Sequence, residues 1–274
     1  MLKIIDAGAL RSERLSEFLA ASPGNRAVLT DYASMESFKG VGSVNIRKSM
    51  KRLAEFPDQV VVLRSTRVVC GLKPRSRGLV NRLIDVSQTS DFGKYCDAIF
   101  SNSVPINLIE ADIKNKENSS QSHFDLLLGN SESIRSGIHK LAGTYRSEDI
   151  NDLRTQRPIS SEFSKRIVSD IISVTALFFK RVGLSAKIPS ASDAIYSFPF
   201  RYALCSYLLS LKWIGDGGYQ SVAPDKIRND FADMTYAAYA TFFDGIITND
   251  KKLEVIYRQA CWTLENVFIK KLRH

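Results

Sequence analysis

The sequence predicts an α/β fold with a mainly parallel central sheet, elaborated by extra helices. Two observations predict it. Short apolar runs lie near both ends of the chain and indicate strands: Leu2–Ile5, Arg26–Leu29, Gln59–Leu63 and Gly245–Thr248. Between these runs lie long stretches with apolar residues at helical spacing. Strands separated by helices favour parallel pairing, because a helical crossover returns the chain to the same end of the sheet.

The N-terminal part has helix start and stop signals between its strands. Ser12 is placed to cap a helix that runs through Ala21, and Thr30 and Asp31 are placed to cap a helix that carries Glu36 in its first turn or so. An amphipathic stretch follows over Val44–Phe56. The β-branched run Thr66–Cys70 is compatible with a further strand.

The middle and C-terminal parts have mainly helical patterns. The predicted helices cover Gly78–Ser87, Phe124–Ala142, Ser160–Arg181, Ala191–Ile214, Pro224–Phe243 and Lys252–Ile269. The polar segment Asn115–His123 predicts an exposed loop. The pattern in Ser160–Arg181 is the strongest, because Phe163, Ile167 and Ile171 recur on one helical face.

Composition narrows the class of protein. The chain has 274 residues, of which 44% are hydrophobic and 24% charged, as in ordinary globular proteins. Four widely spaced cysteines form no CxxC pair, which argues against a zinc site and favours free thiols in a reducing compartment. The longest apolar run, Ile171–Phe179, is too short to cross a bilayer. With no signal peptide expected, we predict a cytoplasmic protein without membrane association.

The formal net charge of +9 favours a polyanionic partner. Basic residues concentrate between the third predicted strand and the next helix, where Gly71, Pro74 and Gly78 indicate a loop. The alternative is that the charge serves only solubility. If the partner is a nucleic acid, these side chains would contact its phosphate backbone: Arg64, Arg67, Lys73, Arg75 and Arg77.

Carboxylates occur where parallel strands end. Asp6 follows the first predicted strand, and Asp250 follows the last one. In parallel α/β sheets the C-terminal edge of the strands is the usual site of ligand binding. Asp230 and Asp233 share one face of a helix, and Glu36 can point toward the same edge. A cluster of carboxylates favours Mg²⁺ or Mn²⁺, although each acid alone is compatible with a cap or a turn.

Three segments resemble motifs of the PIN-like nuclease domain. IIDAG with Asp6 is similar to its first strand and first acid, and VLTDYASMESF with Glu36 to its second motif. DMTYAAYATFFDGIITND is similar to its last two motifs, with Asp233 as the third acid and Asp250 as the fourth. The resemblance covers about residues 1–70 and 200–260.

The resemblance implies a metal-dependent endoribonuclease with a Rossmann-like three-layer sandwich. The catalytic residues, which would also be the ligands of Mg²⁺ or Mn²⁺, are Asp6, Glu36, Asp233 and Asp250. Asp230 is a candidate for an additional metal ligand. Thr248, Asn249 and Asp244 would support them, although Asp244 is equally compatible with a structural role. The expected substrate is single-stranded RNA, and many such proteins are toxins or defence effectors.

The chain is longer than a small PIN-like domain. We therefore expect a single domain over residues 1–274, with its core at about 1–70 and 200–274 and a helical insertion at about 71–199. The insertion could bind an inhibitor or regulatory protein, sense a ligand, form a homo-oligomer or bind RNA.

Three alternatives stay open. The first is a catalytically inactive PIN-like subunit that binds RNA or acts as a scaffold. The second is a structure-specific DNA nuclease, which would be expected to have extra acids such as Asp230 and Asp244. The third is a nucleotide-binding enzyme, and it is disfavoured because the sequence has no GxGxxG or GxxxxGK[ST] motif.

Overall fold

The computed structural model describes residues 1–37, 42–100, 131–183 and 189–270. The chain divides into two compact units. The first unit comprises Met1–His123 and Tyr239–Glu254, and the second comprises Phe124–Ala238 and Val255–His274. Within the described ranges, no helix combines the length and the apolar character that a membrane crossing requires. The predicted loop Asn115–His123 lies outside the described residues.

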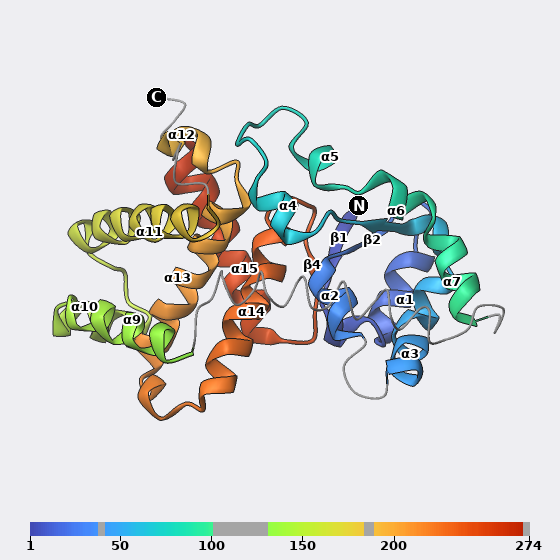
Figure 1. The fold of residues 1–274 in the computed structure, drawn as a ribbon. Helices are drawn as coiled ribbons and strands as arrows, with labels where there is room; N and C mark the ends of the chain where they lie inside the picture. Colours follow the sequence, from blue (N-terminus) through green and yellow to red (C-terminus); the bar gives the residue numbers. More distant parts are fainter. Residues whose placement is uncertain (38–41, 101–130, 184–188, 271–274) are drawn as a thin grey trace. The chain divides into compact units, whose positions relative to one another are not determined.

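The first unit contains a four-stranded, entirely parallel sheet (Figure 1). Its strands are β1 (Leu2–Ile5), β2 (Arg26–Leu29), β3 (Val60–Val62) and β4 (Ile246–Ile247). Their order across the sheet is β3-β2-β1-β4. The predicted α/β class with a parallel sheet is thereby confirmed, and each predicted terminal run contributes one strand.

Both faces of this sheet are buried. Ile4 pairs in register with Val28 and Ile246, and Val28 with Val61, so these four side chains form one apolar row. The alternate residues face the opposite way and join the core with α1 (Glu13–Ala20), α3 (Gly42–Ala54) and α7 (Phe92–Phe100). Burial on both faces explains why the strands are mainly apolar, apart from Lys3 and Arg26, instead of alternating with polar residues.

The remaining elements of the first unit are short. They are η1 (Ala7–Ala9), α2 (Asp31–Glu36), η2 (Pro57–Gln59), α4 (Thr66–Cys70), α5 (Leu79–Leu83) and α6 (Val86–Ser90). The Thr30 hydroxyl caps α2 by accepting a hydrogen bond from the Ala33 amide at 3.0 Å. Glu36 is the last residue of α2, so the expectation that it lies near the start of its helix is wrong.

The run Thr66–Cys70 is a helix, and the strand considered from its β-branched residues is absent there. Thr66, Val69 and Cys70 are buried, whereas Arg67 and Val68 are exposed. This burial repeats at a spacing of three and four residues, which is the helical period. The predicted helix Gly78–Ser87 is likewise divided into α5 and α6, with Ile84 extended between them.

The second unit is helical. It contains α9 (Ser131–Gly143), α10 (Ser147–Thr155), α11 (Ser161–Arg181), α12 (Ala191–Ala194), α13 (Phe198–Asp216), η4 (Tyr219–Ser221) and the π-helical turn η5 (Leu264–Ile269). Most of α14 (Pro224–Ala240) and α15 (Lys251–Thr263) also belongs to it. Helix α11 matches its prediction closely. The predicted helix Ala191–Ile214 is interrupted, because Ser197 caps a new helix with Pro199 in its first turn.

Helices α10 and α11 both pack against α13, which is the most buried helix of the second unit. Aromatic rings occupy this interface, with Phe178 of α11 edge-on to Tyr202 of α13 at 5.1 Å between ring centroids. The two units therefore differ from the expected domain organisation, which had its core at about 1–70 and 200–274 and a helical insertion at about 71–199. Helix α13 forms one unit with α10 and α11 of the expected insertion.

Candidate functional site

The C-terminal edge of the sheet brings two predicted acids to neighbouring strands. Asp6 follows β1 directly, and Asp250 lies three residues after the end of β4. Strands β1 and β4 are adjacent and parallel, with Ile5 opposite Ile247. The chain proceeds from β1 to β2 and β3 on one side of β1, while β4 lies on its other side. The strand order therefore reverses between β1 and β4, which is where open parallel sheets bind ligands.

Asp6 is held by groups from both strand ends. Its Oδ2 accepts a hydrogen bond from the Thr248 hydroxyl at 2.7 Å, and its Oδ1 accepts one from the Gly8 amide at 3.3 Å. The Asn249 side chain donates to the Gly8 carbonyl at 3.4 Å. Arg14 of α1 donates to the Thr248 carbonyl at 3.2 Å. These bonds join the turn after β1 to the turn after β4.

Burial raises the pKa of Asp6 above its ordinary value of 3.8. The hydrogen bonds from Thr248 and Gly8 oppose this rise, because they favour the charged form. The nearby carboxylates of Glu36 and Asp250 raise the pKa further by repulsion. Glu36 and Asp250 are therefore each near enough to influence Asp6 at this edge of the sheet.

Thr248 connects the two aspartates. Its hydroxyl donates to Asp6 and accepts a hydrogen bond from the Asp250 amide at 3.0 Å. Asp250 caps α15, because its Oδ1 accepts bonds from the amides of Lys252 at 2.7 Å and Leu253 at 3.2 Å. Among the described residues, Asp250 Oδ2 forms no hydrogen bond. That oxygen can therefore accept a ligand without loss of the helix cap.

The other predicted acids of the α14 helix lie in the second unit. Asp230 is buried and Asp233 is half-buried, and both interact with other residues. Asp233 is near Tyr202 of α13, whose pKa is raised mainly by burial and to a smaller extent by the charge of Asp233. The structure thus groups Asp6, Glu36 and Asp250 in the first unit and places Asp233 on a helix of the second.

Asp244 lies at the opposite edge of the sheet from Asp6. Its Oδ2 accepts a hydrogen bond from the Leu2 amide at 2.7 Å, and its own amide donates to the Leu2 carbonyl at 2.8 Å. Leu2 begins β1, whereas Asp6 follows its end. These contacts match the structural alternative for Asp244 and not a supporting position beside Asp250.

The predicted basic segment is exposed in the first unit. Arg64 follows β3, Arg67 lies on α4, and Lys73, Arg75 and Arg77 lie in the loop before α5. Arg82 holds this loop. Its guanidinium donates to the carbonyls of Lys73 at 2.7 Å and Arg75 at 2.5 Å. A sixth basic residue of the segment therefore orders the loop, while five remain exposed to a polyanion.

Sequence reasoning missed a buried polar chain that ends on Asp31. The Asp31 carboxylate accepts bonds from the Thr66 amide and hydroxyl, each at 2.7 Å, and the Thr66 hydroxyl is 3.0 Å from the Tyr239 hydroxyl. Burial raises the pKa of Asp31, and these hydrogen bonds oppose the rise. Asp31 lies two residues after the end of β2, whereas Asp6 directly follows β1. A carboxylate this close to a strand end is the signal that could have identified it. Its bonds to Thr66 and Tyr32 indicate a structural carboxylate.

The donor chemistry at the edge suits a hard divalent cation. Asp6, Glu36 and Asp250 supply only oxygen, which Mg²⁺ and Mn²⁺ prefer, and a cation would relieve the repulsion that raises the pKa of Asp6. Among the described residues, no group of three or more His, Cys, Asp or Glu side chains is close enough to hold a metal ion. The edge thus supplies the type of ligand that such a cation needs, but these carboxylates would have to lie closer together to hold it.

Comparisons of the chain with protein-family models, with curated proteins and with solved structures found no match.

Proposed function

We propose that the protein is a metal-dependent endoribonuclease of the PIN-like type, with a Rossmann-like three-layer core and single-stranded RNA as its substrate. The observation that carries the proposal is the pairing of Asp6 and Asp250 at the point where the strand order reverses. The repulsion of Asp6 by the carboxylates of Glu36 and Asp250 supports it. A structural turn or cap has no requirement for several carboxylates at one edge.

In the proposed site, Asp6, Glu36 and Asp250 of the first unit would hold Mg²⁺ or Mn²⁺. The resemblance to PIN-like domains also implies a role for Asp233, which the Asp233→Asn variant tests. The cation would supply Lewis-acid activation of the phosphate and of a water molecule. Thr248 fixes the orientation of the Asp6 carboxylate through its 2.7 Å hydrogen bond. Asp250 stays in place because its Oδ1 caps α15. No protein nucleophile is needed for this chemistry.

The basic segment would bind the RNA backbone. Lys73, Arg75 and Arg77 are exposed in a loop whose path is fixed by Arg82. Side chains on an ordered loop lose less conformational freedom on binding than those on a free one. Contacts to phosphate carry no sequence information, so this segment would set affinity and leave the cleavage site to other features.

The test is cleavage of a labelled single-stranded RNA in Mn²⁺ by wild type and by four variants: Asp6→Asn, Asp250→Asn, Asp233→Asn and Asp244→Asn. We expect wild-type cleavage that EDTA abolishes, a loss of roughly a hundredfold or more for Asp6→Asn, Asp250→Asn and Asp233→Asn, and wild-type rates for folded Asp244→Asn. A folded Asp6→Asn protein that cuts RNA normally would refute the site. A folded Asp233→Asn protein that does so would remove Asp233 from it.

The same assay separates the alternatives. Cleavage of flap DNA without cleavage of RNA would identify a DNA nuclease. Binding of RNA without cleavage of either substrate, together with no Mn²⁺ binding at millimolar concentration, would identify an inactive RNA-binding subunit.

A further inference from the structure

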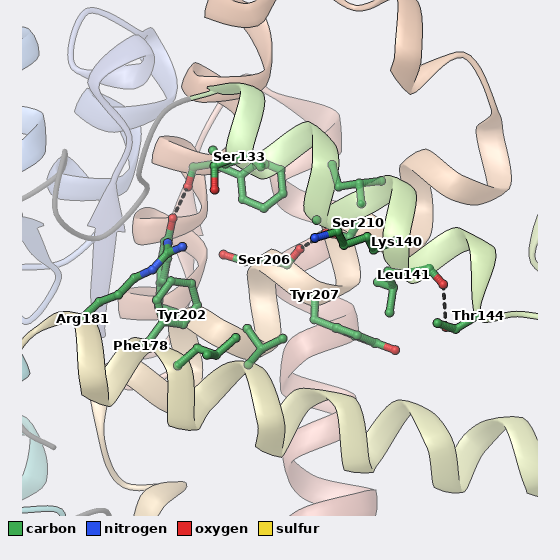
Figure 2. Close-up of a pocket in the computed structure, with 16 residues that line it drawn as sticks. Ser133, Lys140, Leu141, Thr144, Phe178, Arg181, Tyr202, Ser206, Tyr207 and Ser210 are labelled. Atoms are coloured by element: carbon green, nitrogen blue, oxygen red, sulfur yellow. Dashed lines mark hydrogen bonds between the residues drawn. The ribbon is translucent and has the colours of Figure 1, made fainter.

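The second unit contains a cavity of about 400 Å³. Helices α9, α11 and α13 line it, and Phe231 of α14 also contributes (Figure 2). Cavities that bind small molecules in proteins usually have volumes of about 300 to 1,000 Å³ and mainly apolar walls. Every residue of the lining belongs to the second unit, so the cavity is independent of the acids at the sheet edge.

The apolar face of α11 is only partly covered by protein. Phe163, Ile167 and Ile171 are buried, as their helical spacing predicts. Farther along this face, Val174, Leu177 and Phe178 line the cavity, and Leu177 is 57% exposed. Exposure of a large side chain on a core-facing stripe costs hydrophobic free energy. A ligand with an apolar body would recover that free energy.

Ser206 is a buried polar residue in the lining of the cavity. It is only 3% exposed, and its hydroxyl has no hydrogen-bond partner among the described residues. The nearby Tyr202 hydroxyl donates to the Phe231 carbonyl at 2.9 Å. Burial raises the pKa of Tyr202, and the neighbouring Ser206 hydroxyl opposes this rise. Ser206 is one of the residues that line the cavity (Figure 2). A buried hydroxyl without a partner is costly, so a polar atom of a ligand would stabilise it.

The charged residues among the described lining of the cavity are basic: Lys140 of α9 and Arg181 at the end of α11. Behind the lining, Asp170 accepts a hydrogen bond from Tyr207 at 2.8 Å, and Asp233 is near Tyr202. Arg181 also interacts with other residues. An anionic group near these cations would be favoured over a neutral or cationic one.

We propose that the second unit binds a small amphipathic anion in this cavity. The apolar body of the ligand packs between Leu177, Phe178 and Phe231. Its anionic group accepts a hydrogen bond from Ser206 and lies near Lys140 and Arg181. The ligand class is thus an aliphatic or aromatic molecule with a single carboxylate or sulfonate.

Two glycines of α9 supply a matched pair of variants for the test. Gly137 lines the cavity, and a Cβ atom there meets nothing within 4 Å, so Gly137→Phe can fill the cavity without a backbone clash. Gly143 is at the end of the same helix and has equally open surroundings, but it does not line the cavity. Gly143→Phe is therefore the control for adding an exposed phenyl ring to α9.

The probe is anilinonaphthalene sulfonate, titrated into the full-length protein with fluorescence detection. We expect saturable binding to wild type and Gly143→Phe, and loss of that binding in Gly137→Phe. Ser206→Ala should bind on the order of tenfold more weakly. Decanoate should displace the probe at lower concentration than decanol. Absence of saturable binding to wild type, or equal binding by Gly137→Phe and wild type when both unfold cooperatively, would overturn the proposal.

Discussion

Thr248 donates a 2.7 Å hydrogen bond to Asp6, although 242 positions separate the two residues in the sequence. The same hydroxyl accepts the Asp250 amide, so one buried side chain determines the geometry of both strand-end acids. Because Asp6 and Asp250 also repel each other, Thr248 holds an arrangement that the charges alone would disfavour.

Replacing Thr248 by valine tests this link. Valine has a similar shape, but it cannot donate to Asp6 or accept from the Asp250 amide. We expect the free energy of unfolding in urea to fall by about 1–3 kcal/mol. RNA cleavage per folded molecule should fall about 10- to 100-fold, as for other residues that orient metal ligands. Thr248→Ser keeps the hydroxyl and should retain most of the cleavage. Equal losses for valine and serine would show that the hydroxyl is not what matters.

Asp244 should affect stability without affecting chemistry. Asp244→Ala removes the acceptor for the Leu2 amide at the N-terminal end of β1. This contact is exposed, so we expect a loss of about 1 kcal/mol in urea unfolding. The rate of RNA cleavage by the folded fraction should stay at the wild-type level. A large loss of cleavage with unchanged stability would instead return Asp244 to the metal site.

The basic loop should contribute a salt-dependent part of RNA affinity. Replacing both Arg75 and Arg77 by glutamine removes two exposed charges. The slope of log affinity against log salt should decrease by about 1.4, at about 0.7 for each phosphate contact with a single strand. Lys165→Gln, an exposed change on α11, serves as the control and should leave the slope unchanged. An unchanged slope in the double variant would exclude the loop from the RNA contact.

Asp31 should give a distinctive pH dependence of stability. Its pKa in the folded protein is raised above 3.8 by burial, so the folded state binds the proton more tightly than the unfolded state. The stability contributed by this difference is complete below pH 3.8 and is lost as pH rises through the raised pKa. The stability advantage of wild type over Asp31→Asn should therefore shrink across that window. Urea unfolding of both proteins at a series of pH values measures this stability difference. A difference that grows with pH would contradict a raised pKa of Asp31 in the folded protein.

The strands could be predicted from the sequence because each is a mainly apolar run, as expected for a parallel sheet covered on both faces. Their order follows less directly, since only long-range pairing places β4 beside β1. The run Thr66–Cys70 was ambiguous because β-branched residues favour strands, whereas its burial pattern is helical. Tertiary burial decided in favour of the helix.

Asp6 and Asp250 could be predicted as neighbours because both follow parallel strands. The role of Asp244 depends on one backbone contact to Leu2, which no local pattern reveals. The chain from Asp31 through Thr66 to Tyr239 spans segments 35 and 173 residues apart, so only the folded structure shows it. The Ser206 cavity similarly arises from the packing of three helices and has no linear motif.

The most direct test of the central claim is a count of bound Mn²⁺ by electron paramagnetic resonance, in wild type and in Asp6→Asn at matched protein concentration. Asp244→Asn is the control for the loss of one carboxylate elsewhere in the first unit. We predict saturable Mn²⁺ binding by wild type and Asp244→Asn, and weaker binding by Asp6→Asn by about 10-fold or more. Binding of Mn²⁺ by folded Asp6→Asn with wild-type affinity would contradict a metal centre at the ends of β1 and β4.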